Sequence, residues 1–163
     1  MKFNIAIICI SDRSSRGERE DKSKTAIEKF LENMAQTTFY KCVPDEKSII
    51  EETLIDVCDN KKAHILFTTG GTGLAPRDVT PEATLSVAQK LVPGIAQEIR
   101  SKSMEYTQRA MLSRAVCVIR NNVLIVNLPG SPRACVECLQ VIEPVLGHVV
   151  ELLCENVSDC ARE

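Results

Sequence analysis

The feature that most constrains the fold is a short apolar run followed at once by a glycine-rich loop and a helix start. Residues 64–67, His-Ile-Leu-Phe, are typical of a buried strand. The following stretch, 68–82, contains Gly70, Gly71 and Gly73 and ends in Thr80-Pro81-Glu82. A hydroxyl at the N-cap and a proline at the first helical position favour a helix from this point. The sequence therefore predicts a strand, a loop and a helix N-terminus in direct succession.

The side chains of this loop suit an anion site next to a cation site. Glycine leaves backbone N–H groups free to approach a ligand's oxygens, and threonine adds hydroxyl donors. Arg77 provides a planar cation, and Asp78 a carboxylate able to hold a hard metal ion. The loop matches neither the P-loop nor G-x-G-x-x-G, so a plain glycine turn remains the alternative. The candidates for binding phosphate are Thr69, Gly70, Gly71, Thr72, Gly73 and Arg77.

Four apolar runs predict strands, and a polar or glycine-bearing motif follows each of them. The runs are 3–10, 39–43, 64–67 and 123–126, and the motifs are Ser11-Asp12-Arg13, Pro44-Asp45-Glu46, the 68–78 loop and the segment from Asn127 to Pro132. A further run, 115–119, is separated from 123–126 by Asn121-Asn122, which favours a tight antiparallel hairpin.

Helices are expected between these strands because apolar residues recur at helical spacing. The expected helices are 25–34, 46–58, 81–91, 94–106 and a last helix from Ser131-Pro132 onward. Pro144 predicts a kink or break in the last helix, and the polar tail from Glu155 is expected to fray. The polar segment 14–24 is expected to be a loop or mobile flap.

Alternation of strands and helices predicts right-handed crossovers and a mostly parallel sheet. The carboxyl ends of such strands share one edge, where ligands bind and helix N-termini favour anions. We therefore expect the four motifs to border one site. Plainer roles remain open for each motif: Asp45 and Ser131 can be helix caps, and Ser11-Asp12 a solvated turn.

Composition limits the classes of function. The 163 residues fit one domain, 1–163, and a net charge of −2 without clustering argues against nucleic-acid binding. No apolar run approaches the roughly 20 residues of a membrane span, and we see no signal peptide, so we expect a cytoplasmic protein. The eight cysteines are expected to be reduced. Cys135-x-x-Cys138 invites a zinc or redox role, but its position on an apolar helix face favours core packing.

The run TTGGTGLAPRDVTPEAT, residues 68–84, resembles the signature of the molybdopterin adenylyltransferases, the MogA-type branch of the MogA/MoaB/gephyrin family. Members with MoaB-like loops often lack its Arg-Asp-Val-Thr-Pro part. The likeness extends over nearly the whole chain. Its other motifs are Ser11-Asp12-Arg13 with Gly17 and Asp21-Lys22-Ser23, Pro44-Asp45-Glu46, Met111 to Arg114, Asn127 to Pro132, and Glu137-Cys138. Lys24 stands where many members have glycine, which leaves the shape of the 14–24 loop open.

The resemblance implies a three-layer α/β sandwich, a homotrimer, and adenylyl transfer from ATP to the terminal phosphate of molybdopterin with release of pyrophosphate. Asp45 and Asp78 are then the candidates for catalysis and for holding Mg²⁺. A molybdenum-insertion enzyme is a possible partner of such a protein. The residues implied for binding the pterin are Ser11, Asp12, Arg13, Ser113, Asn127, Pro129, Gly130 and Ser131.

Two other functions remain as alternatives to adenylyl transfer. One is a MoaB-like or gephyrin-like domain that binds the pterin, or acts as a scaffold, without transferring AMP. The presence of both Asp45 and Asp78 within their motifs argues against it. The other is an unrelated nucleotide-dependent enzyme built on the same kind of sheet.

Overall fold

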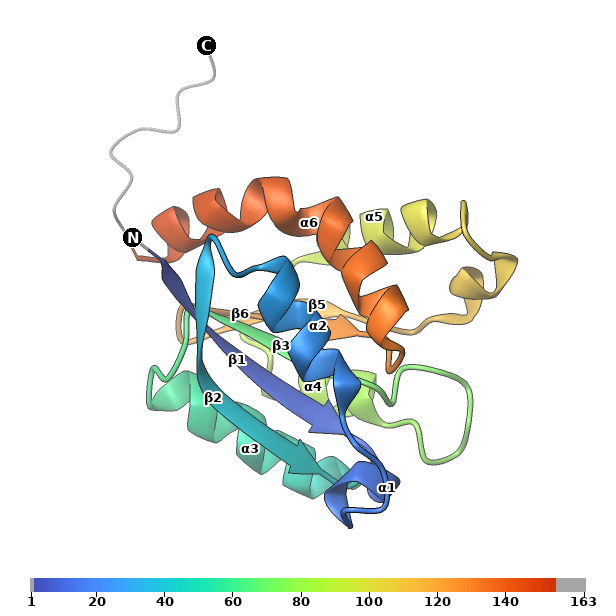
Figure 1. Ribbon diagram of the computed structural model, residues 1–163. Coiled ribbons are helices and arrows are strands. Elements are labelled where there is room, and N and C mark those ends of the chain that lie inside the picture. The colour runs from blue at the N-terminus through green and yellow to red at the C-terminus, as the bar shows by residue number, and fades with distance from the viewer. Residues whose placement is uncertain (1, 155–163) are drawn as a thin grey trace.

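The computed structural model describes residues 2–154, which form a six-stranded mixed sheet covered by helices (Figure 1). The strand order is β2-β1-β3-β6-β5-β4. The first four strands in this order are parallel, and β5 and β4 are antiparallel to their neighbours. The strands are β1 (Phe3–Ile10), β2 (Ala35–Val43), β3 (Ile65–Thr69), β4 (Lys90–Leu91), β5 (Cys117–Arg120) and β6 (Val123–Leu128).

Helices lie on both faces of the sheet and make it the middle of three layers. α2, α5 and α6 pack on one face and α3 and α4 on the other (Figure 1). The alternation along β1 shows why: Ile5 and Ile7 belong to the first core, whereas Ala6 and Ile8 belong to the second. The helices are α1 (Asp12–Ser15), α2 (Lys22–Phe30), α3 (Lys47–Asp59), α4 (Thr80–Val87), α5 (Pro93–Ser103), the 3₁₀ helix η1 (Gln108–Leu112) and α6 (Pro132–Leu153).

The predicted fold class, a mostly parallel α/β sheet with an antiparallel hairpin, is confirmed. Asn121 and Asn122 form the hairpin turn with φ of 46° and 62°. Positive φ at both central residues is what a two-residue turn requires to match the twist of its strands. The hairpin places β5 next to β6, and β4 completes the sheet beyond it.

Several local expectations are wrong. The segment 14–24 is not a simple flap, since α1 occupies Asp12–Ser15 and α2 begins at Lys22 after its N-cap Asp21. Thr80 is the first residue of α4 and not its N-cap, which is Val79. The helix expected over 81–91 ends at Val87, because the backbone turns extended at Ala88 and the next residues form β4.

The last helix, α6, continues through Pro144 to Leu153, so of the predicted kink or break the break is wrong. Ser131 is the N-cap of α6, because its hydroxyl oxygen accepts from the backbone N–H of Ala134. The helix-cap role left open for this residue is therefore confirmed. Both Cys135 and Cys138 are buried in this helix and belong to the core on that face of the sheet, which confirms the packing role. The tail from Glu155, which was expected to fray, and Cys160 within it lie outside the described residues.

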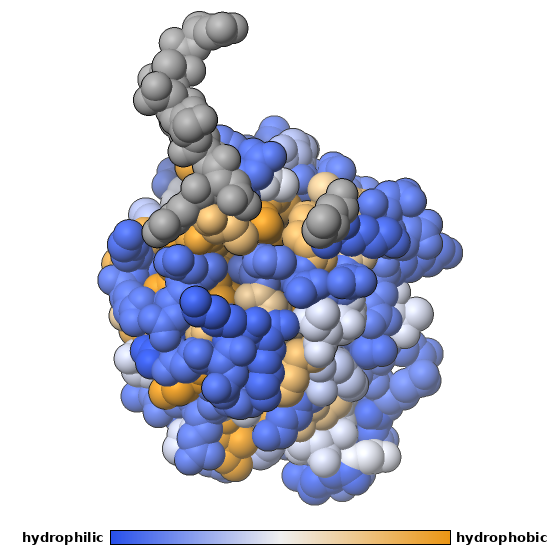
Figure 2. Space-filling view, turned by 90° about the vertical axis from the view of Figure 1, so that its left-hand side faces the viewer, coloured by the Kyte–Doolittle hydropathy of each residue, from blue (hydrophilic) through white to orange (hydrophobic). Residues whose placement is uncertain are grey.

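In the view of Figure 2, apolar side chains emerge as patches among hydrophilic ones. Within residues 2–154, none of the helices combines the length and the apolar character that crossing a membrane requires.

Candidate functional site

A cavity of about 760 Å³ opens at the carboxyl edge of the parallel strands. Residues that follow β1, β2, β3 and β6 all line it, so the predicted meeting of the four motifs is confirmed. Among the candidate residues, those that line this cavity are Ser11, Asp45, Thr69, Gly70, Gly71, Asp78, Gly130 and Ser131.

Asp45 follows β2 and faces this cavity as a half-buried carboxylate. It does not cap α3, because Glu46 occupies the N-cap position and no side chain bonds there. Instead, Asp45 Oδ2 accepts the backbone N–H of Asp12 at 2.9 Å. Burial raises the pKa of Asp45 above its usual range, and the negative charges of Asp12 and Asp78 raise it further. The carboxylate therefore stands where a cation would stabilise it.

Asp78 reaches the same cavity from the glycine loop. Its Oδ2 accepts the N–H of Ala75 at 3.0 Å, which fixes the carboxylate within its own turn. A Cβ added to Gly73 would lie only 2.8 Å from this oxygen, so the glycine leaves the space that the carboxylate occupies. Asp45 and Asp78 thus border one space from two different strand ends. Two oxygen ligands of this kind fit Mg²⁺, which commonly takes one or two protein carboxylates and keeps several waters.

The glycine loop depends on backbone shapes that only glycine adopts easily. Gly70 and Gly71 have φ of 91° and 68°. A Cβ on Gly71 would lie 2.2 Å from Thr80 Oγ1 and 3.3 Å from Asp45 Oδ1. The N–H of Gly70 donates to the carbonyl oxygen of Leu128 at 3.1 Å. Gly70 therefore joins the loop to the end of β6, and its N–H is not available to a phosphate.

Arg77 is engaged by carboxylates and does not line the cavity. Its Nε and Nη2 donate to the two oxygens of Asp12 at 2.8 and 2.9 Å, and Nη2 also donates to Glu46 Oε1 at 3.0 Å. This bidentate contact lowers the pKa of Asp12. Arg77 thus connects the glycine loop to α1 and to the start of α3. Asp12 and the exposed Arg13 also lie outside the lining, so the expected pterin contacts of these two residues gain no support.

The comparison with known proteins agrees with this arrangement. The profile of the family described as "Probable molybdopterin binding domain" matches residues 6–148, a range that runs from β1 into α6 and includes every strand end at the cavity. The chain belongs to this family.

Relatives in this molybdopterin-binding family cover most of the chain. It is 42% identical over 157 residues to the molybdopterin adenylyltransferase of Helicobacter pylori strain ATCC 700392 / 26695, covering 94% of this chain and 89% of that protein. It is 44% identical over 151 residues to the molybdopterin adenylyltransferase of Escherichia coli K12, covering 91% and 77%. Among solved structures, the molybdopterin biosynthesis enzyme MoaB from Thermus thermophilus superposes with a TM-score of 0.87 at 41% identity, covering 93% of this chain and 96% of that one.

A second cavity, of about 290 Å³, lies on the other side of the glycine loop of this molybdopterin-binding domain. It holds the remaining candidates, Thr72, Gly73, Ser113, Asn127 and Pro129. The amide of Asn127 is committed to the core, because Nδ2 donates to the hydroxyls of Thr68 and Thr84 and Oδ1 accepts the N–H of Val116. Its side chain therefore supports the loop and has little capacity left for a ligand.

Arg114 is a positioning residue to which the sequence analysis gave no role. Its Nε donates to the carbonyl of Gly73 at 2.8 Å, its Nη2 to the carbonyl of Asp78 at 2.7 Å, and Nη1 pairs with Glu82. One guanidinium thus holds both ends of the loop segment that carries Asp78. Only the resemblance, which includes Met111 to Arg114 as a motif, contained a signal for it.

Two cations of the 14–24 segment also line the larger cavity, namely Arg19 and Lys22. Ser23 lies between this segment and the end of β6, where its hydroxyl donates to the carbonyl of Gly130 at 3.0 Å. The segment is therefore part of the site wall. Its many charges predicted a solvated loop, and no local pattern showed that it folds back over the strand ends.

Proposed function

We propose that this chain transfers the adenylyl group of ATP to the terminal phosphate of molybdopterin, releasing pyrophosphate, in the biosynthesis of the molybdenum cofactor. The observation that carries the proposal is the convergence of Asp45, Asp78 and the glycine loop on one cavity. The relatives named molybdopterin adenylyltransferase support it, with 42–44% identity over most of the chain.

The reaction joins two anions, so the site must first reduce their repulsion. Arg19 and Lys22 bring positive charge to the cavity wall, and the N-terminal end of α6, which carries the positive end of the helix dipole, borders the cavity at Ser131 and Pro132. We propose that Thr69 and the Gly71 backbone receive phosphate oxygens. These groups can align and neutralise the reacting phosphates without forming a covalent intermediate.

Asp45 and Asp78 would hold Mg²⁺ in this proposal. The ion supplies positive charge to phosphate oxygens when it is bound. The raised pKa of Asp45 fits this role, because burial and neighbouring carboxylates disfavour its charge until a cation is present. The two carboxylates themselves fix where the metal and its phosphate ligands can sit.

The smaller cavity suits the flat pterin ring. Apolar side chains, including Ile99, Ala110, Leu112 and Pro129, line it, and Ser113 provides a hydroxyl at its wall. The glycine loop separates the two cavities, and Thr72 and Gly73 face the smaller one. A pterin held there could extend its phosphate past the loop toward Asp78.

Asp78→Asn tests the proposal. We expect turnover with ATP, Mg²⁺ and molybdopterin, measured as pyrophosphate release, to fall on the order of 10²- to 10³-fold, because preorganised charge at the phosphates is lost. Pterin binding, measured by fluorescence, should persist. Asp56→Asn is the matched control, since this half-exposed carboxylate of α3 pairs with Lys62, does not line the cavity, and its loss should leave turnover unchanged.

Two results would contradict the proposal. Unchanged turnover of the Asp78→Asn variant would remove that carboxylate from the chemistry. Pterin binding by the unaltered chain without any pyrophosphate release would instead support the non-catalytic binding or scaffold function.

We also propose that the chain works in the cytoplasm as a homotrimer and passes its product to a molybdenum-insertion enzyme. Large apolar side chains are exposed on β4, after α5 and on η1. They support an assembly, because their contact with water is unfavourable and a subunit interface would bury them. These side chains are Leu91, Met104, Tyr106 and Met111. Light scattering coupled to size-exclusion chromatography would give the mass of the assembly.

A further inference from the structure

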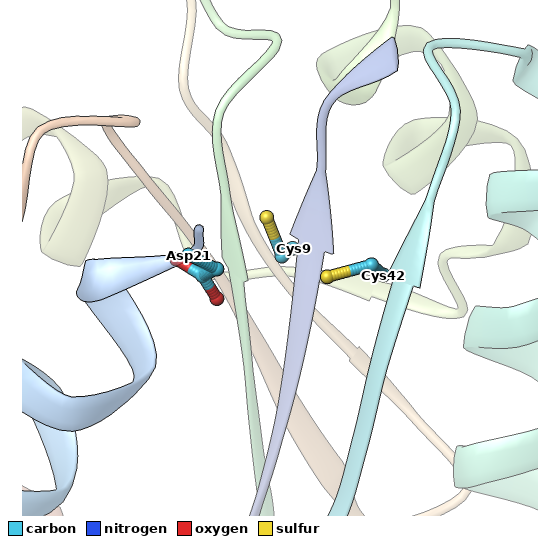
Figure 3. A group of neighbouring side chains, drawn as sticks. All are labelled: Cys9, Asp21 and Cys42. Carbon is cyan, nitrogen blue, oxygen red and sulfur yellow. The ribbon is translucent and has the colours of Figure 1, made fainter. Parts of the chain in front are cut away.

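Two cysteines and a carboxylate lie close together (Figure 3), and two of the three, Cys9 and Asp21, line the larger cavity. Cys9 and Cys42 are directly paired in the register of β1 and β2, so their side chains project from the same face of the sheet. Asp21, the N-cap of α2, reaches them from above this face. The two sulfurs and a carboxylate oxygen all lie within 4.8 Å of one another.

We propose that Cys9, Asp21 and Cys42 form a binding site for Zn²⁺. Two thiolates and one carboxylate are ligands that zinc takes in proteins, and three protein ligands leave a fourth, exchangeable position. Cys9 and Asp21 also line the larger cavity, so the exchangeable position faces it. On binding, each thiol releases its proton to solvent and forms a Zn–S bond, with no change of oxidation state.

The geometry needs little adjustment to hold such an ion. With Zn–S bonds of about 2.3 Å, a tetrahedral site separates its sulfur atoms by about 3.8 Å. The ligand atoms already fall within 4.8 Å, so side-chain rotation can close the site while the two strands stay in register. Cys135 also faces this side of the sheet, but its thiol donates to the carbonyl of Pro129 at 3.0 Å and is already engaged.

A second layer of contacts orients the ligands, as is usual around bound metals. The hydroxyl of Tyr40 lies 3.0 Å from Asp21 Oδ2 and 3.0 Å from Cys42 Sγ. Asp21 Oδ1 accepts the N–H of Ser23 at 2.9 Å, which fixes the other side of the carboxylate. The ammonium of Lys24 sits 5.2 Å from the centre of the Tyr40 ring and brings positive charge near the three anionic ligands.

Co²⁺ provides the direct test, since it replaces Zn²⁺ and makes thiolate ligation visible. The full chain, reduced and freed of metal with a chelator, is titrated with Co²⁺ and then with Zn²⁺. We expect one Co²⁺ per chain, a sulfur-to-cobalt charge-transfer band, the strong visible bands of a four-coordinate ion, and loss of all of them when Zn²⁺ is added. This readout does not depend on adenylyl transfer.

Variants then locate the ion. Cys42→Ser should weaken Co²⁺ and Zn²⁺ binding at least ~10-fold and lower the charge-transfer band. Asp21→Asn should weaken binding about 10-fold and keep that band, while its amide oxygen can still cap α2. Cys58→Ala, on the opposite face of the sheet, and Cys154→Ser, which is exposed, are the matched controls and should bind as the unaltered chain does.

The proposal fails if Cys42→Ser binds Co²⁺ with unchanged affinity and unchanged charge-transfer intensity, because the ion then lies elsewhere. It also fails if the reduced chain binds no stoichiometric Co²⁺, or if mass spectrometry of the unreduced protein shows Cys9 joined to Cys42 by a disulfide. Circular dichroism of each variant checks that a loss of binding does not come from a loss of fold.

Discussion

At the amino ends of the parallel strands polar side chains pair with one another, whereas at the carboxyl ends two carboxylates face a cavity. The Nδ1 atom of His64 accepts the N–H of Asn4 at 2.9 Å, and the Asn4 amide oxygen accepts from Gln36 Nε2 at 2.7 Å. At the opposite edge, neither Asp45 nor Asp78 forms an ion pair with any residue in the range 2–154. The two edges belong to the same strands, so sequence position alone does not separate them.

Strained backbone conformations show the same contrast. Asn121 and Asn122, at the amino end of β6, adopt positive φ in the turn that joins β5 to β6. Gly70 and Gly71, at the carboxyl end of β3, also adopt positive φ. A Cβ on Gly70 would meet the carbonyl oxygen of Ile10, and a Cβ on Gly71 would fill the space beside Thr80 and Asp45. The comparison teaches that polar groups at the amino edge are bonded to one another, whereas the carboxyl edge keeps carboxylate charge available to a ligand. Substitutions should therefore separate stability from turnover according to the edge they touch.

Gly71→Ala should have the largest effect on folding among these substitutions. Alanine would have to adopt the positive φ of this position, and its Cβ would meet Thr80 Oγ1 at 2.2 Å. We therefore expect the free energy of unfolding to fall by about 2–4 kcal/mol and turnover to be lost as well. Chemical denaturation measures the first quantity. Gly17→Ala is the control, since Gly17 has φ of 74° but open space around it, and should cost only about 1–2 kcal/mol. Equal losses for the two variants would show that the clash is absent.

Asp45→Asn should lower pyrophosphate release on the order of 10²-fold and leave the protein at least as stable at neutral pH. The folded-state pKa of Asp45 is raised above its ordinary value of 3.8, chiefly by burial. Its ionisation therefore costs stability as the pH rises through that folded pKa, and the cost disappears below pH 3.8. Asparagine can still accept the N–H of Asp12 and carries no charge.

Thermal melting of both proteins between about pH 3.5 and 8 checks the sign of this effect. The variant should melt at the same temperature as the unaltered chain at the acidic end, and at an equal or higher temperature at the neutral end. A variant that melts lower at neutral pH and keeps full turnover would make Asp45 a structural residue and would erase the contrast between the two edges.

Asn121→Ala should lower the free energy of unfolding by about 1–2 kcal/mol and leave turnover unchanged. The substitution removes the amide contacts with Asp59 and Gln89 and places alanine at a positive φ. Denaturation and pyrophosphate release, measured on the same preparation, separate the two effects. A turnover loss beyond about twofold would mean that the amino edge also influences the site.

Asn122→Gly should have the smallest effect, a gain of a few tenths of a kcal/mol in stability. A glycine at this second turn position, with φ of 62°, gives the Asn-Gly pair that two-residue hairpins favour. The shift of the denaturation midpoint measures this gain. A clear destabilisation would indicate that the Asn122 side chain makes a contact that matters more than its backbone conformation.

The sequence predicted what depends on neighbours along the chain. Continuous apolar runs located β1, β3 and β6 and the second half of β2, the asparagine pair located the hairpin, and the parallel order placed Asp45 and Asp78 at one edge. It failed where pairing partners are distant. The two residues of β4 form a strand because the backbone N–H groups flanking them, those of Gln89 and Val92, donate to carbonyls of Ile119 and Cys117 on β5. In the sequence, the same segment reads as the end of the preceding helix.

The same limit applies to the candidate site. Arg77 has the chemistry of a phosphate ligand, and nothing in its neighbourhood along the chain shows that Asp12 and Glu46 engage it. Arg114 lies 36 positions from Asp78, yet it holds the loop that carries this carboxylate. Contacts of this range depend on the packed fold, so residue type alone assigns them no role.

A buried chain of hydrogen bonds connects the glycine loop to the core. Asn127 donates to Thr68 and Thr84, Thr84 donates to the carbonyl of Thr80, and the hydroxyl of Thr80 donates to the carbonyl of Gly70. Folding already fixes the conformation of the loop. A ligand that binds this loop therefore loses less affinity to ordering it, because the loop is already held in one conformation.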